Sequence, residues 1–452
     1  MTDKETAILT IAKQAEAAGG RAYLVGGCVR DKLMGKQPKD HDIEVHGIAP
    51  DALLEILKGI GEPLSFGESF GIYSLKGLDL DIAMPRHEHA IGRGHRDFEV
   101  EVDPFIGTEK AAMRRDFTIN ALMEDILTGE IIDHFGGRQD LQEGIIRHVN
   151  DVSFKEDPLR VFRGAQFAAR FGFKVSLDTV EICKGMATSE LSSERVEGEL
   201  QKAMLGSDTP SVFFEVLREM DQLEPWFREI KALIGIEQDP IFHPEGDVWN
   251  HTMEVLDRGA KLRDEADEPY AFMLLCLTHD LGKITTTTFE KGRIHAYGHE
   301  SEGLPIAENF MNRLVGSKAV KEYVLGMIPS HMKPNMVAYS RSKVKNTNKM
   351  FDEVPSPKDL ILFSVADRPV MAGDFKFQGD RDFLEERLKI YQNTMSEPYV
   401  MGRDLIEAGL EPGEDFKEIL DYAHKLRLAG IPKSEALKQV LSYAKKLRTN
   451  KL

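Results

Sequence analysis

Strand-like and helix-like hydrophobic patterns occupy different parts of this 452-residue chain. Within about the first 150 residues, helical stretches alternate with four short apolar runs that predict strands: AYLVGG, HDIEVHG, GIYSLKG and LDLDIAMP. We expect helices there from Gly27 to Met34 and from Asp51 to Lys58. From Phe154 to about Phe227, and again from His243 to Asp367, apolar residues recur at spacings of three and four, which predicts helix throughout. An α+β region is therefore followed by a long helical one.

The composition is that of a globular protein. Hydrophobic residues make up 42% and charged residues 29%, which excludes wholesale disorder, a collagen-like repeat and a membrane channel. No run reaches the roughly 18 uninterrupted apolar residues of a transmembrane helix, and the N-terminal stretch lacks the apolar core of a signal peptide. Three scattered cysteines, Cys28, Cys183 and Cys276, are too few for a disulfide framework, so we expect a reducing, cytoplasmic location.

The charge balance limits how the chain could hold nucleic acid. With 75 acidic and 58 basic residues, the formal net charge is −17, which argues against binding through bulk positive charge. A local basic patch remains at the C-terminal end, where Lys425, Arg427, Lys433 and Lys438 precede KKLRTNKL. On charge pattern alone, a nucleic-acid contact and an ordinary solvated helix end are equally good interpretations.

The stretch GGCVRDKLMGKQPKDHDIEVHG carries the first candidate site. Asp40 and Asp42 lie two residues apart in a predicted strand, where alternation points both carboxylates to one face. Such a pair repels unless a cation lies between, and magnesium prefers oxygen ligands. Asp81 in LDLDIAMP, with Asp79 on the same predicted face, is the candidate third carboxylate. Upstream, Gly26 and Gly27 end a strand before a predicted helix and would let a phosphate approach the backbone; a tight turn beside solvated aspartates is the plain alternative.

Taken together, these residues resemble the signature of the polymerase-beta-like nucleotidyltransferases, and more specifically the bacterial class II tRNA nucleotidyltransferase and poly(A) polymerase family. Four further blocks match that family in order: RRDFTIN, DHFGG, KEDPLRVFR and ERVEGELQK. The resemblance covers roughly residues 20 to 230. It implies a head with a small mixed sheet, a helical neck, and Mg²⁺-dependent transfer of nucleotides to RNA 3′ ends without a template.

The resemblance also implies roles for individual residues. Glu156, Asp157 and Arg160 would replace the template by offering hydrogen-bond donors and acceptors to cytosine or adenine. Positions four apart on a helix share a face, so Arg160 could stand beside Glu156, although an ordinary intrahelical ion pair would look the same. Arg115 and Asp116 would contact the triphosphate and the ribose. The implied nucleotide-binding set is completed by Gly26, Gly27, Arg30, Asn120 and Arg163.

Two local features bear on the extent of the reaction. PRHEHAIGRGHRDFEVEVD resembles the flexible head loop of the family, and an intact loop goes with addition of the terminal A as well as the two Cs. Gln166 departs from the family, whose members usually carry arginine there.

A second candidate site lies in the histidine-rich region. His279 and Asp280 end an apolar stretch, with His251 upstream and Asp367 downstream, and such a set can gather N and O ligands around a divalent ion. The order of FHPEGDVWNHT, HDLGK and GHESEG resembles the HD phosphohydrolase domain fused to bacterial tRNA nucleotidyltransferases. The resemblance implies His251, His279, Asp280 and Asp367 as ligands of an unidentified metal. His299 and His331 would bind a phosphate or a second ion.

We therefore expect four domains: a head over 1–137, a neck over 138–235, an HD domain over 236–370 and a helical tail over 371–452 that contacts tRNA. The expected activity is addition of CCA to tRNA from CTP and ATP, with RNA bound at the acceptor arm, no membrane and no protein partner. A poly(A) polymerase and an enzyme that adds only the final A are the nearest alternatives. A metal-dependent phosphohydrolase with an RNA-recruiting head is a further one, and an RNA-binding protein with neither activity is opposed by the acidic pair.

Overall fold

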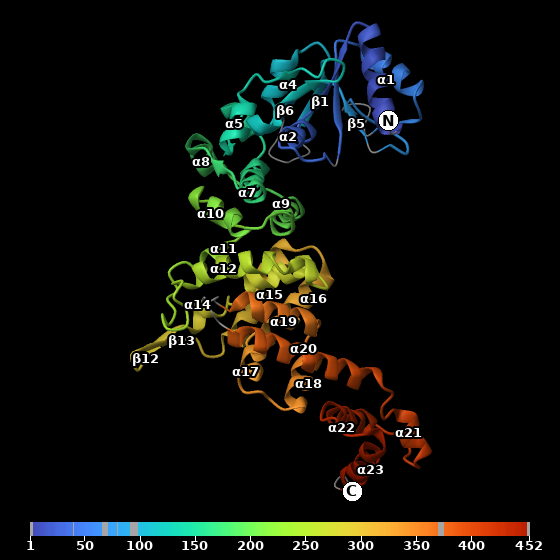
Figure 1. Ribbon diagram of the computed structural model, residues 1–452, viewed down its shortest axis with the longest axis vertical. Coiled ribbons are helices and arrows are strands. Elements are labelled where there is room, and N and C mark those ends of the chain that lie inside the picture. Colours follow the sequence, from blue (N-terminus) through green and yellow to red (C-terminus); the bar gives the residue numbers. More distant parts are fainter. Residues whose placement is uncertain are drawn as a thin grey trace. The chain divides into compact units, whose positions relative to one another are not determined.

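The computed structural model describes residues 3–38, 40–65, 71–78, 80–90, 98–368 and 375–449 (Figure 1). The chain divides into two compact units, Met1–Trp226 and Phe227–Leu452. Each unit is built around its own elements and carries one of the two candidate sites. None of the described helices is both long and apolar enough to cross a membrane.

A mixed sheet forms the head of the first unit. Its described strands run in the order β3-β4-β5-β2-β1-β8-β9, and β2 and β5 are the parallel pair among antiparallel neighbours. Their bounds are β1 Arg21–Val25, β2 Asp42–His46, β3 Pro63–Ser65, β4 Ile72–Leu75, β5 Asp81–Ala83, β8 Met123–Asp125 and β9 Ile131–Ile132. Strands β6 (Arg86–Ala90) and β7 (Phe98–Val102) pair antiparallel within the predicted head loop, whose residues 91–97 lie outside the described part.

One face of this sheet is apolar and covered by helices. Ile8, Ile11 and Ala15 line one side of α1 (Asp3–Ala17) at helical spacing and pack with Leu53 and Leu57 of α3 (Pro50–Lys58). The alternating strand residues Ile43, Val45 and Ile82 belong to the same core. Because strand side chains alternate, Asp42 and Asp81 must lie on the opposite face, away from α1 and α3.

Helices complete the first unit. The amphipathic helix α7 (Leu159–Phe171) ends at Gly172 in the left-handed conformation and packs against α9 (Ser193–Gly206) and α10 (Ser211–Glu219). The remaining elements are α2 Gly27–Leu33, α4 Thr108–Met113, the 3₁₀ turn η1 Thr118–Asn120, α5 Gly137–Glu143, α6 Asp151–Lys155, α8 Leu177–Lys184, and the short parallel pair β10 Ile145–Ile146 and β11 Lys174–Val175.

The second unit is helical around a buried central helix, α13 (Pro269–Thr278), which carries apolar residues on all sides. Helices α12 (Val248–Ala260), α16 (Lys318–Met327) and α19 (Pro357–Asp367) pack on it. The other elements before the C-terminal group are α11 Arg228–Lys231, η2 Arg263–Glu265, α14 Lys283–Thr286, the hairpin β12 Thr288–Glu290 and β13 Arg293–His295, α15 His299–Leu314, η3 Ile328–Ser330, α17 Lys333–Tyr339, α18 Val344–Asp352 and α20 Phe375–Ser396.

The C-terminal helices have a core of their own. Leu405, Ile419 and Val440 meet where α21 (Gly402–Glu407), α22 (Phe416–Leu428) and α23 (Lys433–Thr449) pack together. Figure 1 shows these three helices in dark red beyond α20. The exposed lysines Lys438, Lys445 and Lys446 lie on α23.

The predicted fold class, α+β with a helical remainder, is confirmed. Three expectations about local structure were wrong. Helix is not continuous from Phe154 to Phe227 or from His243 to Asp367, because β11 and the β12–β13 hairpin interrupt it. Strand β2 begins at Asp42, so Asp40 precedes it. Glu156 and Asp157 lie between α6 and α7, since the residue before Pro158 disfavours helix, and they do not share a helix with Arg160.

Candidate active sites

Three predicted carboxylates meet at the start of two strands of the head. Asp42 and Asp81 are direct partners in the parallel β2–β5 pair, and Asp40 lies just before β2. Burial raises the pKa of the Asp42 carboxyl, and the charges of Asp81 and Asp40 raise it further, against the lowering effect of Arg115. Mutual repulsion of this kind is what a divalent cation would relieve, and carboxylates are suitable ligands. Asp79 falls outside the described residues.

Glu44, the next residue of β2 on the same face as Asp42, forms ion pairs with two arginines. Its Oε2 accepts from Arg114 at 3.0 Å and from Arg115 at 3.5 Å, and its Oε1 pairs with His46 Nε2 at 2.9 Å. Burial favours the protonated acid, but the hydrogen bond to His46 and the charges of Arg115 and Arg114 lower the pKa of Glu44 to about 2. Glu44 therefore stays ionised and anchors Arg115 beside Asp42. Sequence reasoning missed it, although its position two residues after Asp42 was a usable signal.

Gly26 makes room for one of these arginines. Its φ of +72° is a left-handed conformation, and a Cβ there would come within 2.9 Å of an Arg115 guanidinium nitrogen. A side chain at this position would thus meet both backbone strain and a charged neighbour. The glycine is needed at the turn between β1 and α2.

Asp116 ties the head to helix α7. Its Oδ2 accepts from Arg163 Nε at 2.7 Å, while its Oδ1 accepts from Asn120 Nδ2 at 2.9 Å and from the Phe117 backbone at 2.7 Å. Burial opposes ionisation, but Arg163 and Asn120 lower the pKa of Asp116 below its usual range. Asn120 Oδ1 in turn accepts from Arg30 at 2.6 Å. The oxygens of Asp116 are thus committed to holding protein groups, Arg163 above all.

These residues surround a cleft of about 300 Å³ in the first unit, at the lower end of the size of small-molecule sites. Seven of its lining residues besides Asp42 were predicted as nucleotide-binding: Gly26, Gly27, Arg30, Arg115, Asp116, Asn120 and Arg163. Four further residues line it: Gln166, which was noted only as a departure from the arginine of the family, and Phe167, Arg170 and Lys202, which were missed. Three of these follow Arg163 on α7 at spacings of three, four and seven, which was a detectable signal. Gln166 is 1% exposed, and its Nε2 has no hydrogen-bond partner in the described structure.

The three residues expected to read the base lie beside this cleft and outside its lining. Arg160 donates to the carbonyl oxygens of Ser153 and Arg114, both at 2.7 Å. Asp157 caps α7 through the Leu159 backbone and pairs with Arg195 at 3.0 Å. Glu156 is exposed at the end of α6. Arg160 thus contacts Arg114, the neighbour in sequence of Arg115, and Arg115 lines the cleft.

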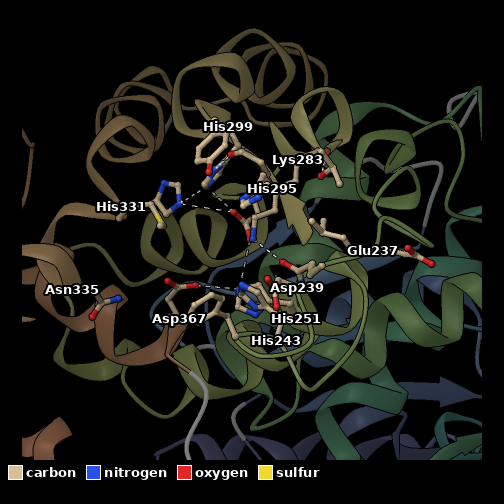
Figure 2. A pocket seen from close by; sticks show the side chains of 18 of the residues that line it. Glu237, Asp239, His243, His251, Lys283, His295, His299, His331, Asn335 and Asp367 are labelled. Atoms are coloured by element: carbon tan, nitrogen blue, oxygen red, sulfur yellow. Dashed lines mark hydrogen bonds and ion pairs between the residues drawn. The ribbon is translucent and has the colours of Figure 1, made fainter. Parts of the chain in front are cut away.

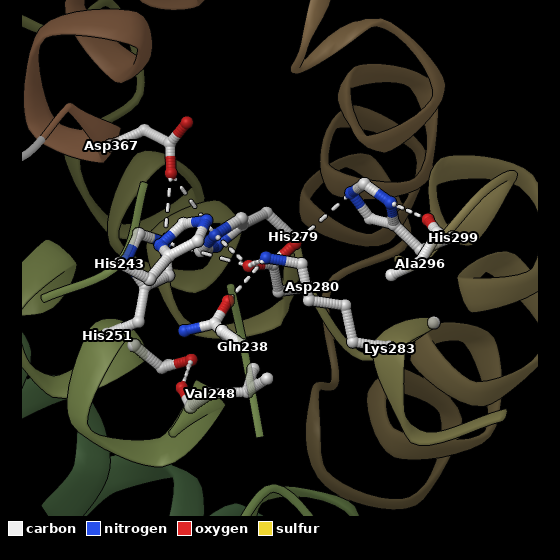
Figure 3. Close-up of polar contacts among 12 residues, drawn as sticks. Gln238, His243, Val248, His251, His279, Asp280, Lys283, Ala296, His299 and Asp367 are labelled. Atoms are coloured by element: carbon white, nitrogen blue, oxygen red, sulfur yellow. Dashed lines mark hydrogen bonds and ion pairs between the residues drawn. The ribbon is translucent and has the colours of Figure 1, made fainter. Parts of the chain in front are cut away.

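In the second unit, three of the four predicted metal ligands, His251, Asp280 and Asp367, line a pocket of about 690 Å³ (Figure 2), and His279 lies buried against them. His251 comes from α12, His279 and Asp280 follow α13, and Asp367 ends α19. Asp367 Oδ1 lies 3.1 Å from His251 Nε2 and 3.4 Å from His279 Nε2. Asp280 Oδ2 lies 3.2 Å from His279 Nε2 and 3.6 Å from His251 Nε2. Two imidazole nitrogens and two carboxylates therefore face one another (Figure 3).

The carboxylates of Asp280 and Asp367 favour a positive charge between them and the two histidines. Burial lowers the pKa of His279, but Asp280 and Asp367 outweigh it and raise the value to about 9. His279 Nδ1 faces the Cys276 carbonyl at 3.1 Å, and His251 Nδ1 faces Glu245 Oε1 at 2.7 Å, which orients both Nε2 atoms inward. Nitrogen and carboxylate donors arranged in this way suit a divalent transition metal. The described residues thus include groups able to hold a metal ion.

Three polar residues around this centre were not singled out from the sequence. Lys283 Nζ donates to Asp280 Oδ2 and to Gln238 Oε1, both at 2.7 Å, and Glu245 Oε1 also pairs with His243 at 2.9 Å. Lys283 lies four residues after His279 in HDLGK, so its proximity was foreseeable. Gln238 and Glu245 reach the site through loops, whose course no periodicity predicts.

Comparisons with known proteins find one family model in each of the two compact units. A family model described as the poly A polymerase head domain matches residues 22–147, and one described as the HD domain matches residues 248–371. The multifunctional CCA protein of Actinobacillus pleuropneumoniae serotype 5b (strain L20) is 34% identical over 415 residues, which cover 90% of this chain and 97% of that protein.

Two solved structures share the fold. The Bacillus stearothermophilus CCA-adding enzyme in complex with CTP has a TM-score of 0.67 and 21% identity, with 100% of each chain covered. The Thermotoga maritima CCA-adding enzyme complexed with tRNA-CCA has a TM-score of 0.64 and 22% identity, over 97% of this chain and 95% of that one.

Proposed function

Since the chain belongs to the family of the multifunctional CCA proteins, we propose that it is a template-independent tRNA nucleotidyltransferase that adds C, C and A to tRNA 3′ ends. The tRNA 3′-hydroxyl attacks the α-phosphorus of CTP or ATP, a new phosphodiester bond forms, and pyrophosphate leaves. The observation that carries this function is the cleft of the first unit, which is lined by Asp42 together with the basic side chains of Arg115, Arg163 and Lys202.

The acidic side of the cleft is the proposed magnesium site. Asp40, Asp42 and Asp81 would hold Mg²⁺, since their carboxylates repel one another and hard oxygen ligands suit this ion. When bound, Mg²⁺ activates the attacking hydroxyl and stabilises the pyrophosphate leaving group. Glu44 has a positioning role, because it fixes Arg115 beside Asp42 through a buried ion pair.

The basic side of the cleft is the proposed triphosphate site. Arg30, Arg115, Arg163 and Arg170 surround it, and guanidinium groups bind phosphate oxygens in a bidentate way. Asn120 and Asp116 hold Arg30 and Arg163 in place. Glu156, Asp157 and Arg160 are assigned to base selection. Arg160 reaches the incoming base only if its hydrogen bonds to Ser153 and Arg114 are exchanged for bonds to that base.

The second unit supports an additional activity. His251, His279, Asp280 and Asp367 would hold a divalent metal, and a metal of this kind polarises a phosphate ester for attack by water. Lys283, whose ammonium group lies in the same pocket, would bind the negatively charged phosphate. We assign this site to metal-dependent hydrolysis of a phosphate ester, as phosphatase or phosphodiesterase.

We retain the proposed division into a head (1–137), a neck (138–235), an HD domain (236–370) and a tail (371–452). The neck and HD domain would bind the tRNA acceptor arm by shape and backbone, as double-stranded RNA is usually bound. Exposed Lys438, Lys445 and Lys446 on α23 supply positive charge to the tail.

A nucleotide-supply assay tests the main function and separates it from its nearest alternatives. Transcripts of tRNA that end before CCA, after C and after CC are incubated with CTP and ATP, and the products are sequenced. Completion of CCA on all three is expected. Long oligo(A) would indicate a poly(A) polymerase, and extension of the CC transcript alone would indicate an A-adding enzyme; either result would overturn the proposal.

A further inference from the structure

A buried carboxylate of the second unit pairs with two arginines, and one of them lines the pocket of the proposed metal site. Asp380 on α20 is 4% exposed. Its Oδ2 accepts from Arg368 Nη1 at 3.0 Å, and its Oδ1 lies 3.1 Å from Arg341 Nη2. The described lining of the pocket includes Arg368 but neither Asp380 nor Arg341. The pocket wall therefore contains an arginine whose guanidinium is fixed by a carboxylate outside the pocket.

The end of α19 brings this arginine to the metal ligands. The helix ends at Asp367, and Arg368 follows in an extended conformation, with φ −78° and ψ 127°. Residue 369 is a proline, and the residue before a proline disfavours helix. Consecutive residues thus supply a proposed metal ligand and a cation to one pocket.

The sharing of one carboxylate leaves a positive charge on this group of side chains. Two guanidinium groups and the Asp380 carboxylate, two positive charges and one negative, sum to +1. The head repeats this arrangement, because Glu44 pairs with both Arg114 and Arg115, and Arg115 lines the cleft of the first unit. A surplus positive charge on the wall of a pocket favours an anionic ligand.

The other two cations of the described pocket lining are paired differently. Lys283 donates to Asp280, which is itself a proposed metal ligand. Arg293 directs two nitrogens, both at 2.8 Å, to Asp239, and the described ion pairs give this carboxylate no second arginine. The Arg293 pair is therefore neutral, whereas Arg368 shares its carboxylate with another arginine.

We propose that Arg368 binds a non-bridging oxygen of the substrate phosphate in the pocket of the second unit, and that Asp380 and Arg341 hold it in position. This inference rests on the hydrolysis of a phosphate ester proposed above. Guanidinium groups form strong charge-assisted hydrogen bonds with phosphate oxygens. The Arg368 side chain is 21% exposed, and its described bond to Asp380 uses one of three guanidinium nitrogens.

A purely structural role is the weaker explanation of these contacts. The pair of Arg368 with Asp380 joins the end of α19 to α20, and one arginine would be enough for that purpose. The second arginine, Arg341, has a φ of +47°, a backbone conformation that is uncommon outside glycine. An ordinary contact between two helices would not need a second charge brought in from such a conformation.

Inorganic phosphate tests the inference without relying on hydrolysis. The full chain with Asp40→Ala and Asp42→Ala, which removes the proposed head metal site, is loaded with Mn²⁺. Broadening of the phosphorus NMR signal of phosphate by the bound ion then gives the dissociation constant of phosphate in the second unit. The test variant is Arg368→Gln, and Arg368→Lys restores the charge. The control is Arg293→Gln, at the arginine of the same pocket that forms a neutral pair.

We expect Arg368→Gln to raise the dissociation constant of phosphate about tenfold or more, the effect of losing one hydrogen bond between charged groups. Arg368→Lys should recover most of the affinity, and Arg293→Gln should keep the affinity of the parent. Equal affinities of the parent and Arg368→Gln would overturn the inference, and a loss of thermal stability without a loss of affinity would identify the role as structural. An equal loss in Arg293→Gln would also contradict it.

Hydrolysis is measured separately on the same samples, with p-nitrophenyl phosphate and bis(p-nitrophenyl) phosphate. A parent that broadens the phosphate signal but hydrolyses neither ester would overturn the proposed hydrolysis, while the dissociation constants still decide the role of Arg368. Hydrolysis by a parent whose affinity for phosphate does not depend on Arg368 would leave the proposed hydrolysis standing and reject the inference. No broadening in any of the proteins would overturn both.

Discussion

A single carboxylate oxygen of Asp116 in the head, Oδ2, accepts from two nitrogens of Arg163 on helix α7, at 2.7 Å from Nε and 2.6 Å from Nη2. Asp116 is 7% exposed, so the carboxylate lies largely out of water, while the Arg163 side chain is 32% exposed. It joins the sheet side of the cleft to the helix that carries Gln166, Phe167 and Arg170. The width of the cleft therefore depends on this ion pair together with the hydrogen bond from Arg160 on the same helix to the Arg114 carbonyl oxygen.

Replacing this carboxylate should loosen the cleft. In Asp116→Asn, Arg163 keeps only the more distant carboxylate of Glu199, at 4.0 Å, and because its side chain is 32% exposed we expect a loss of about 2–3 kcal/mol, below the roughly 3–5 kcal/mol of a fully buried pair. Urea unfolding measures this loss, and kcat/KM for CTP should fall with it. Glu181→Gln, which removes an exposed pair with Lys184, is the matched control and should change stability by less than about 0.5 kcal/mol. Equal stabilities of the two variants would contradict this account.

The ionised state of Glu44 predicts a pH dependence. Folding lowers the pKa of Glu44 from the ordinary 4.5 to about 2, so its contribution is complete above pH 4.5 and is lost as the pH falls towards 2. The shift corresponds to about 3 kcal/mol. Unfolding free energies of the natural protein and Glu44→Gln should therefore differ more at pH 7 than at pH 3. A difference that does not change with pH would show that Glu44 is not held ionised.

Gln166 is expected to contact the bound nucleotide. Its buried Nε2 lines the cleft without a partner in the described structure, and a hydrogen bond to a charged phosphate is worth about 1.5–3 kcal/mol. Gln166→Ala should raise KM for CTP and ATP by about tenfold or more, with a smaller effect on kcat. Gln139→Ala, at an exposed glutamine paired with Glu143, is the control. An unchanged KM would mean that Gln166 has only a packing role.

Gly282 should tolerate no side chain. A Cβ would overlap the His299 carbonyl oxygen, and overpacking of this kind typically costs about 1–3 kcal/mol. Gly198→Ala, in helix α9 with no atom near its Cβ position, should instead stabilise by about 0.5–1 kcal/mol. Thermal unfolding compares the two variants, and a neutral Gly282→Ala would contradict the close approach of α15.

The site residues that could be predicted from the sequence are those marked by a local pattern of spacing. Asp42 and Asp81 followed from strand alternation, and the HD pair with His251 followed from its place at the end of an apolar helix. Gln238 and Glu245 were missed because loops bring them to the site, whereas Glu44 was missed although strand alternation places it on the same face as Asp42. Pro158 also went unused, although it separates Glu156 from the helix of Arg160. Local periodicity thus pointed to the proposed ligands, but not to the groups that orient them.

The central claim is that the Asp40 and Asp42 carboxylates support nucleotide addition in the first unit. Labelled CMP and AMP incorporation into tRNA lacking CCA measures this directly in the natural protein and in Asp40→Ala with Asp42→Ala. The account predicts complete CCA in the first and no incorporation in the second, while Mn²⁺-dependent hydrolysis of a phosphodiester by the second unit persists in both. Continued extension of the tRNA by the double variant would contradict it.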